Sequence, residues 1–163
     1  MESNATKADP SARAALAAAA RIADDTLLDE LIALGIRSDT ISALGLVPLA
    51  AVAWADGRLD EAERRIVLAA ARDAGLDAAG PGRRLLEASL ATSPPPWLWT
   101  LWRSYVASAS ATLPAAESRR WRDDVVARAR RVAEAAGGFK GVLPKVSVHE
   151  AALLDEIGRA FAG

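Results

Sequence analysis

The sequence predicts an all-α protein, a single globular bundle of seven to eight helices. No stretch alternates apolar and polar residues as a half-buried strand would. Apolar residues instead recur three and four residues apart, and glycine and proline interrupt the pattern at short intervals, as in bundles with short loops. We expect residues 1–10 to form a disordered tail, because they are small and polar, and residues 11–163 to fold as one domain.

The N-terminal part of the domain predicts two short helices. Residues 11–22 are rich in alanine, and Ser11 is the expected N-cap. The next helix starts at Asp24 or Asp25 and stops at Gly35, because glycine favours the left-handed conformation that ends many helices.

Two helices and the turn between them follow at the centre of the chain. The first has Pro48 in its first turn and closes at Gly57. Asp60 is the expected N-cap of the second helix, and Glu63 completes a capping box three residues later. The stripe of this second helix that we expect to be buried consists of Leu59, Ala62, Ile66, Ala69 or Ala70, and Ala74.

The segment Ser93-Pro94-Pro95-Pro96 separates a short helix, residues 83–92, from a helix rich in tryptophan. One stripe of this helix consists of Trp97, Leu98, Leu101, Trp102 and Tyr105, while Trp99 faces elsewhere. Aromatic residues dominate both cores and interfaces, so a core and a partner-binding groove are alternative explanations. The candidate interaction residues are therefore Trp97, Trp99 and Trp102, with Trp99 preferred if it is exposed.

Residues 115–136 form the longest expected helix, with Trp121 on its buried stripe. Its arginines are Arg119, Arg120, Arg122, Arg128, Arg130 and Arg131. Acidic residues in the same segment largely offset them, which favours an ion-paired, solvated face; an acidic partner or lipid headgroups are the alternatives. A glycine-rich turn at residues 137–141 follows, and Ser147 then caps the last helix, in which His149 should be exposed.

Asp56 is the unusual residue of the central turn, because it continues the apolar face of a helix at the end where the dipole disfavours an anion. Three explanations stay open: hydrogen bonds from the turn backbone, an ion pair, or a divalent cation of the calcium or magnesium type held with Asp60 and Glu63. The sequence pattern D-G-x-L-D-x-x-E at residues 56–63 matches the second half of an EF-hand loop. Val52 and Trp54 occupy the first acidic positions, which excludes a standard EF-hand.

The motif A-x-A-W-A-D-G followed by R-L-D-E-A-E-R, within residues 51–65, resembles the TerB family, named from tellurite resistance. It is also similar to the N-terminal domains of certain membrane-anchored J-proteins. A degenerate second copy lies at residues 132–157, where Ser147 and Glu150 repeat the capping pair of the first copy. The copy departs from the motif, because Gly137 replaces the aspartate and extra residues lengthen the turn. The likeness covers residues 41–163 and implies a doubled helix-turn-helix.

The resemblance implies a small helical stress-response protein that partners membrane-associated complexes and chelates metal. The candidate ligands are Asp56, Asp60, Glu63 and Glu150. The alternative is a metal-free adaptor that binds a protein through the tryptophan-rich helix. A hydrolase that uses a carboxylate pair as acid and base is the least supported hypothesis, and we expect no enzyme.

Composition narrows the function classes. The net charge of −1 argues against nucleic-acid binding, which needs a basic excess. The chain has no cysteine and one histidine, which excludes zinc–thiolate sites and cysteine nucleophiles and fits a cytoplasmic setting. No apolar stretch approaches the roughly 20 residues that a membrane span requires.

Overall fold

The computed structural model describes residues 9–137 and 146–162, and throughout these ranges the chain is helical without strands, which confirms the predicted fold class. The helices are α1 (Pro10–Ala20), α2 (Asp25–Ala33), α3 (Ile41–Leu44), α4 (Val47–Ala53), α5 (Glu61–Asp73), α6 (Pro81–Ala91), α7 (Pro96–Ala111), α8 (Ala115–Gly137) and α9 (Val148–Ala160). None of them is long and apolar enough to cross a membrane. Most of the predicted tail and of the glycine-rich turn lies outside the described residues.

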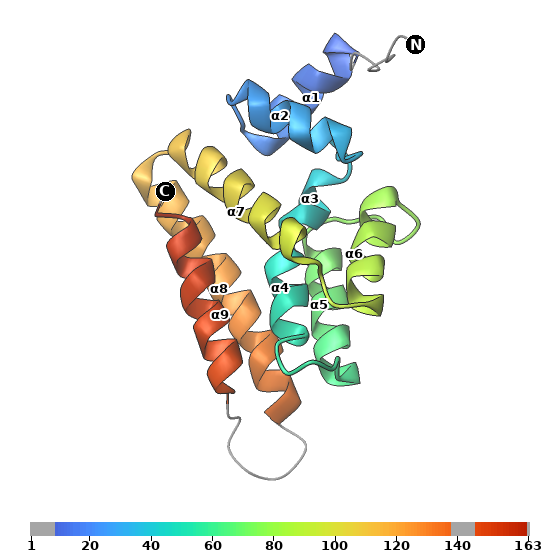
Figure 1. Cartoon of the computed structure of the whole chain (residues 1–163), viewed down its shortest axis with the longest axis vertical. Coiled ribbons are helices and arrows are strands. Elements are labelled where there is room, and N and C mark those ends of the chain that lie inside the picture. The colour runs from blue at the N-terminus through green and yellow to red at the C-terminus, as the bar shows by residue number, and fades with distance from the viewer. Residues whose placement is uncertain (1–8, 138–145, 163) are drawn as a thin grey trace.

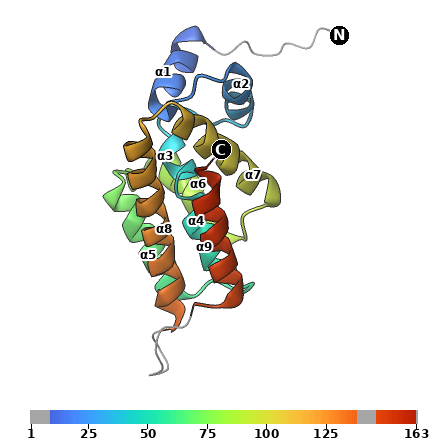
Figure 2. The same cartoon turned by 90° about the vertical axis from the view of Figure 1, so that its left-hand side faces the viewer.

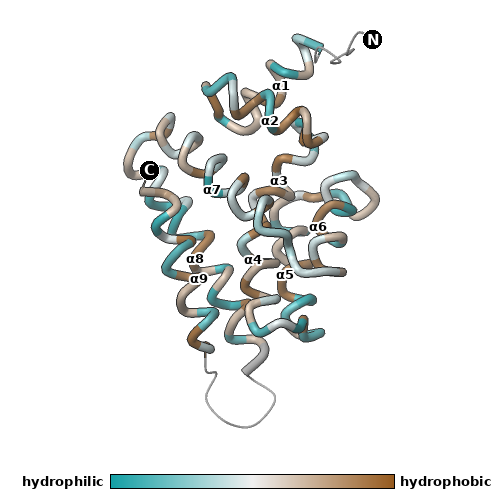
Figure 3. The backbone as a smooth tube through the Cα atoms, viewed as in Figure 1, coloured by the Kyte–Doolittle hydropathy of each residue, from teal (hydrophilic) through white to brown (hydrophobic). Residues whose placement is uncertain are grey.

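Helix α4 is the centre of the bundle, packed against α5, α6, α7, α8 and α9 (Figure 1). It is buried almost all round, because only Ala51 among its residues is not fully buried. Helices α8 and α9 lie side by side along one edge (Figure 2). Hydrophobic and hydrophilic segments alternate along both of them, as expected of helices that bury one side (Figure 3).

Helices α1 and α2 pack on each other at one end of the molecule, and Arg13 joins them through ion pairs with Asp25 and Asp29. The N-cap of α1 is Asp9 and not Ser11, because the Asp9 carboxylate accepts a hydrogen bond from the Ser11 N–H and Pro10 occupies the first turn. The helix therefore begins earlier than predicted. The expected cap Asp24 is confirmed at α2.

Aromatic rings connect α7, α8 and α9 through the core. Trp102 is completely buried, and its ring meets that of Phe161 edge-on, at a centroid distance of 6.3 Å. Phe161 in turn meets Trp121 at 5.0 Å, and Trp121 meets Tyr105 at 5.9 Å. The core stripe predicted for the tryptophan-rich helix is confirmed except at Trp97, which is 55% exposed.

Candidate functional site

The acidic turn that follows α4 differs from the expectation. The helix ends at Ala53, before the predicted position, and the Gly57 N–H donates to the Trp54 carbonyl oxygen at 2.8 Å. Gly57 adopts the positive φ of 81° that this turn requires. Asp56 therefore lies beyond the helix, and its side chain is 50% exposed. The prediction that Asp56 lies on the buried face of the helix is wrong, because the chain turns away first.

The capping box at the start of α5 is confirmed. The Asp60 carboxylate accepts from the Ala62 N–H at 2.8 Å, and one Glu63 carboxylate oxygen accepts from the Asp60 N–H at 2.9 Å. Glu63 is only 4% exposed, which is unusual for a residue of a first helical turn. The backbone N–H of Asp60 therefore holds this carboxylate inside the bundle.

The same arrangement recurs at the start of α9, as the sequence echo predicted. The Ser147 hydroxyl accepts from the Glu150 N–H at 3.2 Å, and a Glu150 carboxylate oxygen accepts from the Ser147 N–H at 2.6 Å. Glu150 is 3% exposed. The described parts of both motif copies thus contain a buried capping glutamate.

The two capping boxes lie near each other at one end of the bundle. Burial raises the pKa of Glu63 to about 7; the Asp60 N–H opposes this, and the negative charges of Glu150, Asp60 and Asp56 add to it. The His149 imidazole, exposed as predicted, stands 4.0 Å from the Asp56 carboxylate. Sequence reasoning missed this proximity, although the repeated capping motif was its visible signal.

The candidate metal ligands come near one another without forming a metal centre. Within residues 9–137 and 146–162, no three histidine, aspartate or glutamate side chains are grouped so that they could hold an ion. Asp60, Glu63 and Glu150 each use a carboxylate oxygen to accept a backbone N–H. The arrangement caps two helices, and the described residues give no support to a metal site.

The three candidate interaction tryptophans have different surroundings. Trp102 has no exposed surface, so it belongs to the core and cannot contact a partner. Trp99 is half-buried and stacks on Trp102 at a centroid distance of 4.9 Å. Only Trp97, in the first turn of α7, offers an exposed ring, which reverses the expected preference for Trp99.

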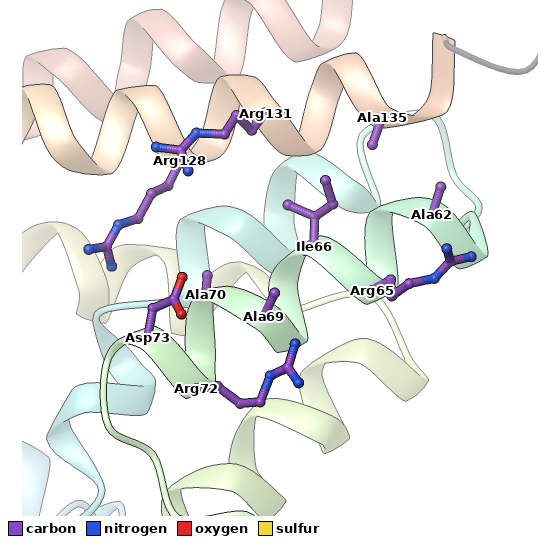
Figure 4. A pocket seen from close by; sticks show the side chains of 10 residues that line it. All are labelled: Ala62, Arg65, Ile66, Ala69, Ala70, Arg72, Asp73, Arg128, Arg131 and Ala135. Atoms are coloured by element: carbon purple, nitrogen blue, oxygen red, sulfur yellow. The ribbon is translucent and has the colours of Figure 1, made fainter.

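A groove of about 450 Å³ that the sequence did not predict lies between α5 and α8 (Figure 4). Its floor consists of small or apolar residues, namely Ala62, Ile66, Ala69, Ala70 and Ala135. Arginines line both rims, Arg65 and Arg72 from α5 and Arg128 and Arg131 from α8, and Asp73 lies at one end. Most of these floor residues belong to the stripe of the second central helix, now α5, that we expected to be buried. In the structure Ile66 and Ala69 of this stripe are only partly covered.

The rim arginines make no ion pair with any described residue. The ion pairs that residues of α8 do form are Arg122 with Asp123, and Glu117 with Arg21 at the C-terminal end of α1. The ion-paired face expected for this helix is therefore absent at Arg128 and Arg131. The groove joins exposed positive charge to a partly covered apolar floor.

Comparison with protein-family models, with curated proteins and with solved structures finds no match to this chain. The fold, the paired capping boxes and the groove are therefore the observations on which a function has to be argued.

Proposed function

We propose that this chain is a non-enzymatic interaction module of the TerB-like kind, which binds a protein partner in the groove between α5 and α8 without a metal ion. The groove is the observation that supports this proposal. An apolar stripe at helical spacing normally lies under another element, yet nothing in the described chain covers Ile66 and Ala69 completely. A partner would complete that burial.

The likeness of residues 51–65 to the TerB family supports a role in a cytoplasmic stress-response complex, as a scaffold for other proteins. In this proposal the acidic turn fixes the fold. Asp60, Glu63 and Glu150 serve as helix caps, so the residues that carry the resemblance need no ion to explain them. The exposed ring of Trp97 is a second place at which this adaptor contacts a protein partner.

Site-specific photo-crosslinking in the native cell tests the proposal. A photoreactive amino acid replaces Arg72 on the groove rim or, as the matched control, Arg103, which is exposed on α7 outside the groove. We expect a discrete crosslinked partner from the Arg72 position alone. Identical product patterns from both positions, or no product from either, would refute a partner in this groove.

A further inference from the structure

We propose that the occupant of the groove is an acidic amphipathic helix of a partner protein, with one apolar stripe flanked on both sides by carboxylates. This inference rests on the proposed function and adds the chemistry of the partner. It follows from the length of the groove, from the size of the floor residues and from the position of the charges.

The length of the groove fits a short helix. Its lining on α5 extends from Ala62 to Asp73. At about 1.5 Å per residue this is about 16 Å, or about three helical turns. Ala62 and Ala135 face each other at one end, and Ile66 projects between the two helices (Figure 4). Alanine side chains on the floor allow the backbone of a docked helix to approach closely, so that it would pack against α5 and α8 at once.

The charges on the rims define the polar flanks of the partner. Arg65 and Arg72 are seven residues apart on the same side of α5, and Arg128 and Arg131 are three residues apart on α8. A helix lying between these rims places the residues beside its apolar stripe against guanidinium groups on both sides. Glutamate or aspartate at those positions complements the arginines, whereas lysine is repelled.

Other anionic ligands fit the groove less well. A nucleic acid needs a long track of phosphate contacts, and here the arginines border an apolar floor in a protein of net charge −1. A lipid surface is flat, whereas these arginines line the two sides of a groove (Figure 4). Both ligands are included in the test as competing outcomes.

The test uses the full chain and two synthetic peptides of about 14 residues, a length slightly greater than the groove at about 1.5 Å per residue. Both carry leucines along one helical face; the first has glutamates on both flanks and its twin has glutamines. Fluorescence anisotropy should show that the glutamate peptide binds about tenfold more tightly than its twin, with an advantage that shrinks as salt screens the charges. Vesicles rich in phosphatidylserine and a single-stranded oligonucleotide should displace neither peptide from the protein.

Charge reversal then locates the binding site. Arg65→Glu with Arg131→Glu changes two exposed residues, so the fold should survive. This variant should lose about tenfold or more in affinity for the glutamate peptide and should bind a lysine version of the peptide more tightly than the wild type does. Arg103→Glu with Arg120→Glu alters the net charge equally at exposed residues outside the groove and should bind as the wild type does.

The outcomes distinguish this inference from the proposed function. The inference of an acidic helix would be overturned if the glutamate and glutamine peptides bound with equal affinity, or if neither bound while the Arg72 crosslink persisted. In both cases the proposal of a partner in the groove would stand. Binding of vesicles or of the oligonucleotide in place of the peptide would overturn the inference of an acidic helix as well. Loss of both peptide binding and the crosslink would overturn the proposed function itself.

Discussion

Replacing Glu63 with glutamine should make the protein more stable at alkaline pH. The Glu63 side chain is 4% exposed, and burial, together with nearby negative charge, raises its pKa to about 7 from the ordinary 4.5. Glutamine has a similar shape, and its side-chain oxygen can accept the same hydrogen bond from the Asp60 N–H, now 2.9 Å from a carboxylate oxygen. The substitution thus removes the buried charge and keeps the cap.

The sign follows from the protons bound in each state. Between pH 4.5 and about 7 the folded protein holds the Glu63 proton, whereas the unfolded chain has released it. Stability contributed by this group is therefore fully present in acid and is lost as the pH rises through that window. The difference between 4.5 and about 7, at about 1.4 kcal/mol for each pH unit, gives a loss of about 3 kcal/mol.

Urea unfolding at pH 5 and pH 8 measures this effect. Glu63→Gln should exceed the wild type by less than about 1 kcal/mol at pH 5, near the start of the window, and by about 3 kcal/mol at pH 8. Glu61→Gln, at an exposed residue of the same helical turn, is the matched control and should follow the wild type at both pH values. A Glu63→Gln protein that is less stable than the wild type at pH 8 would refute the reasoning, because the carboxylate charge would then stabilise the cap.

Three further predictions concern the core, the turn and metal ions. Trp102→Ala should destabilise the fold by about 3–5 kcal/mol in urea unfolding, since it empties a completely buried ring site, and a loss below about 1 kcal/mol would contradict that burial. Gly57→Ala should destabilise the fold by about 1 kcal/mol. The cost comes from the positive φ of this residue alone, because no atom lies within 4 Å of the added methyl group, and an unchanged Tm would show that the turn relaxes. Ca²⁺, Mg²⁺, Mn²⁺ and Zn²⁺ should leave Tm unchanged relative to chelator, whereas an ion at 100 times its Kd would raise Tm by about 5–10 °C.

Local patterns in the sequence predicted the helices well where a single segment fixes the outcome. Asp60 with Glu63, and Ser147 with Glu150, form capping boxes at the predicted residues, because such a box needs only four consecutive residues. The prediction of Ser11 as N-cap is wrong, because Asp9 is a good N-cap and Pro10 is favoured in the first turn, so the helix begins at these residues.

The candidate site was harder to predict because it depends on segments far apart in the chain. The expectation of ion pairs on the long helix came from counting acidic residues in the same segment. Asp124 stands four residues before Arg128, yet no ion pair joins them in the structure, and Arg128 instead extends toward the end of α5 (Figure 4). Which side of α5 is covered also follows from tertiary packing, which leaves Ile66 at the groove and buries Val67.

Helix α5 carries the capping residue Glu63 and one rim of the groove, and the roles of the two can be separated experimentally. Glu63 points into the bundle and is absent from the groove lining, whereas Arg65 lines the groove and is exposed. Glu63→Gln should therefore change the pH dependence of stability and leave affinity for the glutamate peptide intact. Arg65→Glu with Arg131→Glu should do the reverse. If Glu63→Gln weakened peptide binding as strongly as the arginine variant, the acidic turn would belong to the binding site and would have more than a structural role.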